Sequence, residues 1–249
     1  MRYSGVLLVG LLCAQNILSM GARLGFYRSQ FLSPTDRNST LTTLSPTYRS
    51  GITGFLSWGW SEYFATGLEI GYQGVGQKFY GVGFRGESYT SEVSLNYLRL
   101  GVGFQPQYAQ DSWGIWASLA PGLSLLTRSD LNFSGDTLAQ GTLIMPQIAR
   151  RVLNYLEKST NPEDRLLPVR MYRRVVPTLS VSGGLRVRLA PTVWVLGLFY
   201  YERSFGDMEK KGYKIPGDES PLYSRERKPV RYQLTGIQVG LQYEVSIRP

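Results

Sequence analysis

A strict alternation of residue types runs through residues 176–203, which form two predicted strands joined by a tight turn at 190–192. In the first strand, every second residue from Pro177 to Leu189 is apolar or glycine, and the residues between them are small, polar or cationic. A period of two is typical of a strand that separates two environments. The polar side carries two arginines close together, which do not suit an ordinary soluble core. Lipid on one side and a wet lumen on the other would accommodate both faces, so we predict a transmembrane β-hairpin.

The same alternation recurs along the chain and gives eight predicted strands with the hairpin included. The other six are Arg23–Arg28, Arg49–Trp58, Tyr63–Gln73, Val93–Phe104, Ser112–Leu126 and Arg231–Ile247. The connections alternate between long and short, as the outer loops and periplasmic turns of outer-membrane barrels do. The expected fold is therefore all-β: an eight-stranded antiparallel transmembrane barrel with long outer loops. The longest loop, an insertion over about 128–174, contains a predicted short helix, Met145–Lys158, whose apolar residues recur at helical spacing.

The N-terminus has the composition of a secretory signal peptide. Arg2 is followed by a short apolar run, Val6–Leu12, and then by smaller and polar residues. We expect residues 1–21 to be the signal peptide, cleaved after Gly21, and residues 22–249 to be the barrel; cleavage after Ala14 is the alternative. The only cysteine, Cys13, lies in this segment without a small residue before it, so lipidation is not expected.

Aromatic residues collect at the short-turn ends of the predicted strands, and four of the five tryptophans are among them. Membrane proteins concentrate tryptophan and tyrosine at the lipid–water boundary. The residues predicted to form this interface girdle are Trp58, Trp60, Tyr63, Trp113, Trp194 and Tyr243. Tyr72, Tyr200, Tyr201 and Tyr232 are candidates for the opposite interface. A soluble barrel has no reason to sort its tryptophans by end, so the membrane is favoured over a secreted lipocalin-like barrel.

Three segments in the predicted strands two to five carry motifs that recur in a known family. They are Gly54-Phe55-Leu56, Gly67-Leu68-Glu69-Ile70-Gly71-Tyr72 with Gly76-Gln77-Lys78, and Leu95-Asn96-Tyr97-Leu98-Arg99-Leu100. In strand order, the chain resembles the PorT-like family of small outer-membrane β-barrels from the Bacteroidetes lineage. The resemblance implies an outer-membrane protein of a Gram-negative bacterium without enzymatic activity. Some relatives serve gliding and type IX secretion.

Charged residues fall on the face of the strands that we expect to line the lumen. They are Arg23, Glu69, Arg99, Arg186, Arg188 and Glu244. Counted from the short turns, Glu69 and Arg99 lie at similar depth on neighbouring strands, as do Glu244 and Arg23 where the last strand meets the first. The interior of an eight-stranded barrel is just wide enough for side chains, so we predict a packed ionic network. The alternative is a lumen that binds anions or conducts protons.

The composition argues against catalysis and against a bound cofactor or metal. Histidine is absent from all 249 residues, which removes imidazole ligands and the usual base for a serine nucleophile. The stretch Gly81–Gly86 matches the phosphate-binding pattern G-x-G-x-x-G, but it lies between strands rather than before a helix, so loop glycine is the better explanation. We expect no enzyme, no cofactor and no metal site.

The two longest predicted loops are rich in basic residues and form the expected functional surface. Those singled out are Arg150, Arg151, Lys158, Lys210, Lys211 and Lys214. Such side chains can pair with lipopolysaccharide phosphates or with acidic envelope or secretion proteins, or they can simply be solvated. Nucleic acid is not an expected partner, because the +9 net charge is divided between lumen and loops. The predicted function is a scaffold or assembly component of the cell envelope; a narrow pore or solute-binding barrel is the alternative.

Overall fold

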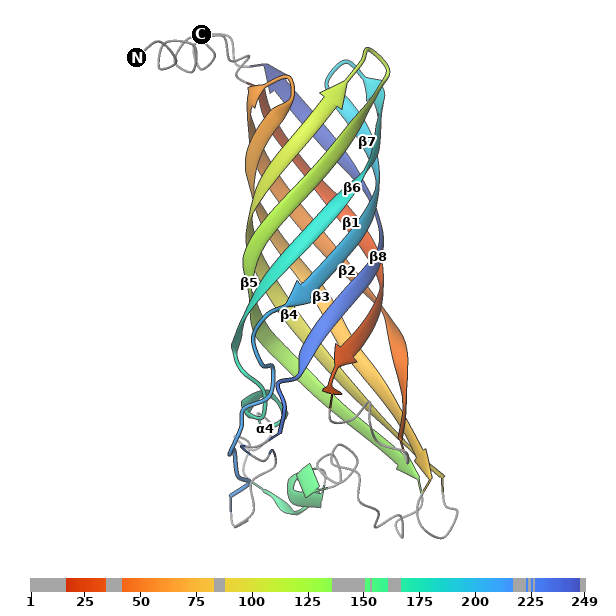
Figure 1. The fold of residues 1–249 in the computed structure, drawn as a ribbon, viewed down its shortest axis with the longest axis vertical. Coiled ribbons are helices and arrows are strands. Elements are labelled where there is room, and N and C mark those ends of the chain that lie inside the picture. Colours follow the sequence, from red (N-terminus) through yellow and green to blue (C-terminus); the bar gives the residue numbers. More distant parts are fainter. Residues whose placement is uncertain are drawn as a thin grey trace, which may run out of the picture.

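The protein folds as a single closed antiparallel barrel in which each strand pairs with its neighbours in sequence and β1 pairs with β8 (Figure 1). The computed structural model describes residues 17–34, 42–82, 88–135, 151–152, 154–160, 167–216, 223, 225 and 227–246. The strands are β1 Ile17–Leu32, β2 Thr42–Ser61, β3 Phe64–Val82, β4 Ser88–Ala109, β5 Trp113–Gly135, β6 Val175–Ala190, β7 Val193–Ser204 and β8 Arg231–Ser246. The predicted fold, an eight-stranded antiparallel barrel, is confirmed.

The connections separate by length between the two ends of the barrel. Short turns join β2 to β3 at residues 62–63, β4 to β5 at 110–112 and β6 to β7 at 191–192. These turns lie at the end where β1 begins and β8 ends, and the long connections join the strands at the other end (Figure 1). We call them the short-turn end and the loop end.

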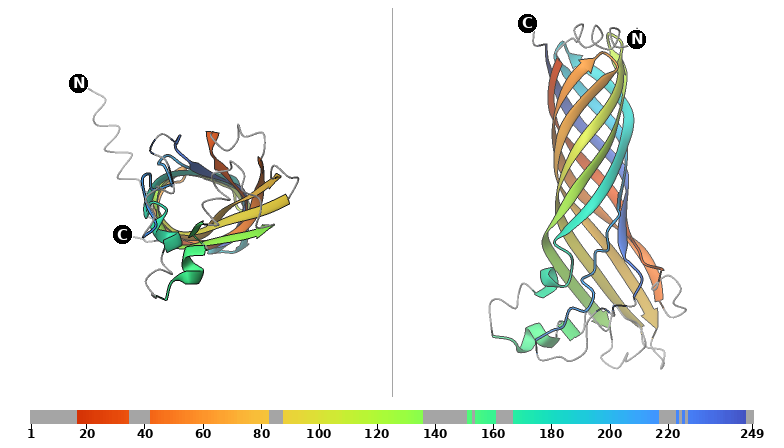
Figure 2. Two further views of the ribbon diagram at one scale, coloured as in Figure 1. Left: turned by 90° about the horizontal axis from the view of Figure 1, so that it is seen from below. Right: turned by 60° about the vertical axis from the view of Figure 1, so that its left-hand side comes forward.

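Several strands are longer than their predicted ranges. β3 continues past its predicted end at Gln73 to Val82, and β4 begins at Ser88 rather than Val93, so most of the loop expected between these strands is strand instead. The many glycines there suggested a loop, yet Val75, Phe79 and Val93 keep the inward alternation and are buried. β2 to β5 project beyond the rest of the ring at the loop end (Figure 2).

β1 also starts earlier than predicted, at Ile17, and is paired with β2 and β8 from that residue onward. Cleavage of a signal peptide after Gly21 would remove the start of this strand, whereas cleavage after Ala14 would leave it whole. The cleavage site stays a prediction.

The predicted insertion begins later than residue 128, because β5 continues to Gly135. Residues 151–152 and 154–158 are helical, in agreement with the C-terminal part of the predicted helix; its beginning, Met145–Arg150, falls outside the described residues. A further short helix, α4 (Leu167–Arg170), precedes β6.

The barrel is apolar outside and polar within, as the alternation predicted. Leu185 is 58% exposed and the neighbouring Arg186 only 3% exposed. The same contrast holds on β8, where Val239 and Leu241 point outward and Gln238 is buried. An exterior of this kind is stable only in contact with lipid.

Among the described helices, none has the length and apolar character needed to cross a membrane.

Candidate functional site

A charge-neutral layer of four buried side chains lies across the middle of the lumen. Glu69 on β3 accepts hydrogen bonds from Arg23 on β1 at 2.9 Å and from Arg99 on β4 at 3.0 Å. Arg99 also lies 3.0 Å from Glu202 on β7. Two cations and two anions thus pair across the lumen, as buried charges require. We call Arg23, Glu69, Arg99 and Glu202 the ionic layer.

Glycine makes room for these long side chains in so narrow a barrel. A Cβ atom at Gly101 would come within 2.8 Å of the Arg99 guanidinium, and one at Gly25 within 1.8 Å of the Tyr27 hydroxyl. The inward glycines therefore mark the points at which large lumen residues fold over the neighbouring position.

Polar and aromatic groups surround the ionic layer and complete its hydrogen bonds. Tyr232 and Tyr200 each donate a hydrogen bond to the Glu202 carboxylate, the former at 2.7 Å. Gln238 donates to Tyr27 at 2.9 Å, and the Tyr27 and Tyr200 rings lie 5.0 Å apart. Because Tyr200 and Tyr232 are fully inside the barrel, their predicted place at an interface was wrong.

Glu202 is not among the predicted lumen residues, although the strand alternation indicates its position. Tyr200 and Glu202 alternate with the exposed Tyr201, so the period of two alone places both in the lumen. The adjacent pair Tyr200 and Tyr201 made it unclear which of the two faces the lumen, because either tyrosine can lie at a membrane interface.

A second charged cluster lies in the lumen near the short-turn end. Arg186 on β6 pairs with Glu244 on β8 at 2.7 Å, and the indole nitrogen of Trp194 donates to the same carboxylate at 2.8 Å. Arg186 and Arg188 both lie 4.5 Å from the centre of the Trp194 ring.

This cluster corrects three sequence predictions. The pair of Glu244 with Arg23 was wrong: β1 and β8 align Ser19, not Arg23, with Glu244, so the two charges lie at different depths. Trp194 does not belong to the girdle, because its side chain is 0% exposed inside the barrel. Arg188 lies at the exposed rim and only stacks on Trp194, since the strand leaves the lumen there.

Apolar side chains fill the space on both sides of the ionic layer. Phe55, Trp116, Leu196 and Leu198 form a cluster toward the short-turn end, and the Arg23 guanidinium lies 4.9 Å from the Phe55 ring and 5.1 Å from the Trp116 ring. These contacts leave Arg23 enclosed by carboxylate on one side and aromatic faces on the other.

At the loop end, the connections fold inward and pack against the projecting strands. The buried residues that they contribute are Val152, Met171, Tyr172, Met208, Ile215, Tyr223 and Val230. We call this set the loop plug. Its two main segments pair through a bridge between Tyr172 and Glu209, with Arg173 donating its backbone N–H to Met208 at 2.7 Å.

One buried carboxylate anchors the loop plug. Glu209 pairs with Arg227 at 2.7 Å and with Lys211 at 3.0 Å. Burial raises the pKa of the Glu209 carboxyl, although the hydrogen bond and charge of Arg227 and the charge of Lys211 act in the opposite direction. Lys211 also lies 3.3 Å from Asp207.

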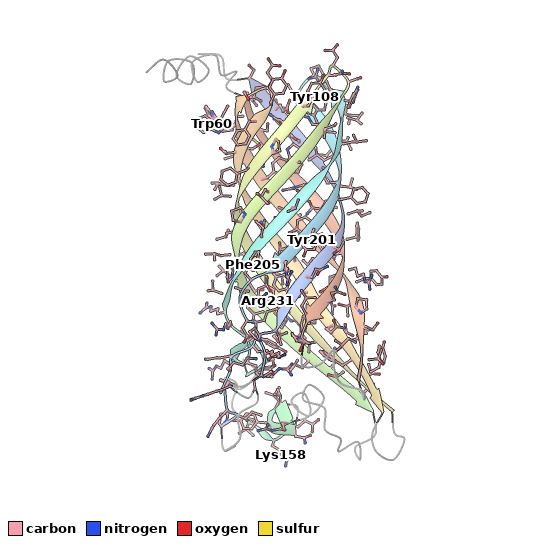
Figure 3. The ribbon with its side chains drawn as sticks, in the orientation of Figure 1. Trp60, Tyr108, Lys158, Tyr201, Phe205 and Arg231 are labelled. Atoms are coloured by element: carbon pink, nitrogen blue, oxygen red, sulfur yellow. The ribbon has the colours of Figure 1, made fainter. Side chains whose placement is uncertain are left out.

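The remaining predicted girdle residues all point outward near the short-turn end. They are Trp58, Trp60, Tyr63, Trp113 and Tyr243. Figure 3 labels Trp60 at that end, together with a further aromatic residue, Tyr108. Tyr108 stacks parallel to Tyr63 with 6.4 Å between ring centres. Their place at a lipid–water boundary stays a prediction, and their outward position agrees with it.

The predicted basic surface is divided by the structure. Lys158, Lys210 and Lys214 are exposed, and Lys158 lies far out at the loop end (Figure 3). Lys211 instead forms ion pairs with Asp207 and Glu209, and Arg151 is half-buried. Arg150 lies outside the described residues. Within the described part of the chain, no three acidic, histidine or cysteine side chains gather in a way that would hold a metal ion.

Comparison with known proteins gives similarity of fold only. No family model matches the sequence, and no curated protein matches it. Among solved structures, the outer membrane protein OprG from Pseudomonas aeruginosa is 8% identical with a TM-score of 0.43, covering 94% of this chain and 98% of that one. Neisserial surface protein A is 9% identical with a TM-score of 0.38, covering 91% and 96%.

The outer membrane protease OmpT from Escherichia coli is 12% identical with a TM-score of 0.37, covering 94% of this chain and 98% of that one. At such low identity and TM-score, these likenesses say nothing about activity. The closed sheet and the apolar exterior by themselves make the chain an eight-stranded β-barrel of the outer-membrane type.

Proposed function

We propose that this protein is a non-enzymatic, non-conducting barrel of the outer membrane that serves as a scaffold or assembly component of the cell envelope. The observation that carries the proposal is the ionic layer. Arg99 reaches from β4 across the lumen to Glu202 on β7 and also donates to Ser180 on β6 at 2.7 Å. A lumen bridged by paired side chains offers an ion no continuous water path.

The absence of catalysis rests on the sequence, which contains no histidine to activate serine or water. The role in assembly rests on the resemblance to the PorT-like family. In the segment Asn96-Tyr97-Leu98, Tyr97 is buried and stacks on Tyr232 with 5.5 Å between ring centres. This motif thus supports the lumen, and the surface open to partners is the loop end.

Conductance in planar bilayers tests the closed lumen. The purified protein, shown to be folded by its heat-dependent gel mobility, is expected to give no steady channels. Steady single-channel steps would instead favour the narrow pore.

Release of the protein with the periplasm in a cell fractionation would exclude the membrane and favour a soluble barrel.

Photo-crosslinking in intact cells tests the role in assembly. A photoreactive residue at Lys158, which is exposed at the loop end, is expected to capture envelope proteins. The matched control is the same residue at Leu185, which faces lipid and is expected to give no protein adduct. Equal or absent adducts at the two positions would contradict a partner at the loop end.

A further inference from the structure

The outer wall of the barrel has a cavity of about 1310 Å³ where β4, β5 and the start of β6 meet the loop plug. Its floor is a row of apolar side chains aligned across three strands, because Leu98 is in register with Leu125 and Leu125 with Val175. All three side chains are at least partly exposed on the outer wall. The floor therefore continues the lipid-facing surface of the barrel.

The rim of the same cavity is cationic. Arg173, Arg174 and Lys210 line it, and all three are exposed. Within the described residues, no carboxylate pairs with any of these three side chains, and the Lys210 ammonium lies 5.3 Å from the centre of the Tyr213 ring. The next residue, Lys211, is by contrast paired with Asp207 and Glu209. The rim therefore has positive charge available for a ligand.

The rim is held in place by backbone hydrogen bonds rather than carried on a free loop. Leu126 at the edge of β5 donates its N–H to the Arg174 carbonyl at 2.8 Å, and Lys210 donates to Met171 at 2.9 Å. The Arg173 N–H is bound by Met208, as described above. A rim fixed in this way loses little conformational entropy when a ligand binds.

The level of the cavity along the barrel identifies the chemistry of its ligand. Toward the loop end from Leu98, Leu125 and Val175, the next positions exposed at least in part on the outer wall of these strands are polar or cationic. A ligand that fills both parts must carry an acyl chain and an anionic headgroup. Arginine binds phosphate through two parallel hydrogen bonds, and a phosphate carries more negative charge than a single carboxylate to meet three cations.

We infer that this cavity is a binding site for a phosphorylated lipid of the outer leaflet, namely lipid A, with an acyl chain on the Leu98–Leu125–Val175 row and a phosphate between Arg173, Arg174 and Lys210. The inference rests on the proposed place of the barrel in the outer membrane. It adds a defined site to the general contact with lipid that every such barrel makes.

Native mass spectrometry of the full chain in detergent micelles, titrated with lipid A, tests the inference. The variant R173Q/R174Q is expected to bind lipid A at least about tenfold more weakly than the unaltered protein. The control K158Q/R225Q removes the same charge from two exposed loop positions and is expected to bind as the unaltered protein does. Heat-dependent gel mobility shows that each variant is folded.

Two further arms distinguish the source of the phosphate. Dephosphorylated lipid A is expected to bind as weakly as lipid A does to R173Q/R174Q, and millimolar inorganic phosphate is expected to leave lipid A binding unchanged. Equal loss in both double variants, equal binding of dephosphorylated lipid A, or displacement by inorganic phosphate would each overturn the site. Bilayer conductance of the same preparations reports on the closed lumen independently, so failure of the site and failure of the proposed function give different results.

Discussion

The middle of the barrel and its loop end are both filled by buried side chains, but of opposite kinds. In the middle, strands supply charges that pair across the lumen, as Arg99 does with Glu69 and Glu202. At the loop end, connections supply apolar side chains such as Met208 and Tyr223 that are buried against the projecting strands. The ionic layer cannot be disturbed without disturbing the barrel, because its residues belong to the strands. The loop plug is attached to a barrel that is already closed, so it can open by itself.

The largest expected effect comes from the ionic layer. Replacing Glu69 with leucine removes the carboxylate that pairs with Arg23, which keeps a hydrogen bond to Gln238 at 3.3 Å, and removes one of the two carboxylates of Arg99. Loss of one partner from a buried pair costs about 3–5 kcal/mol, because the remaining charge stays desolvated. The free energy of unfolding in lipid vesicles, from a urea titration, measures it.

The matched control is Glu92→Leu. Glu92 pairs with Arg49 at 2.7 Å, but both side chains of that pair are partly exposed. We expect a loss of at most about 1 kcal/mol there, because water still screens the remaining charge. Similar losses for Glu69→Leu and Glu92→Leu would mean that the ionic layer is no more enclosed than the wall near the loop end.

The next effect in size concerns the two faces of one strand. Leu185→Arg places a charge on the lipid side of β6 and is expected to cost about 2–4 kcal/mol if the residue lies near the midplane. Ser182→Asn changes a buried lumen position of the same strand and should be milder. The same urea titration compares the two, and equal damage would contradict the assignment of the faces.

The difference between the middle and the loop end also sets what the sequence could predict. Alternation along each strand placed Glu69, Arg99 and Arg186 inside, because the face of a side chain is a local property of a strand. Their partners were harder to predict: Arg186 pairs with Glu244 through the stagger of the closed sheet, which no single strand reveals.

The loop plug and the cavity on the outer wall had no such local signal. Tyr172 meets Glu209 only after two distant connections fold back into the mouth of the barrel. The sequence showed basic loops, but it could not show that Lys211 is paired while Arg174 lines a cavity. Long-range contacts of this kind depend on the whole fold, so the charge count alone overstated the free basic surface.

A smaller effect on global stability is expected when the anchor of the loop plug is removed. Arg227→Gln weakens the contact with Glu209, and the plug should open while the strands stay paired. We expect chymotrypsin to cut residues 205–223 faster and the unfolding free energy to fall by less than about 1 kcal/mol. Arg225→Gln, at an exposed position of the same connection, is the control and should leave cleavage unchanged. A drop as large as that of Glu69→Leu would show that plug and barrel unfold together.

The smallest single loss in the barrel wall is expected at one of two arginines that the alternation treats as equivalent. Arg188 is exposed and contributes only its stacking on Trp194, so Arg188→Gln should cost no more than about 0.5–1 kcal/mol. Arg186 stacks on the same ring but also pairs with Glu244 from a buried position, so Arg186→Gln should cost at least twice as much. Both variants keep a polar side chain of similar reach, so the urea titration compares the missing charge at two depths. Equal losses would mean that the position of Arg188 is as shielded from water as that of Arg186. They would also mean that the ion pair between Arg186 and Glu244 contributes little to stability.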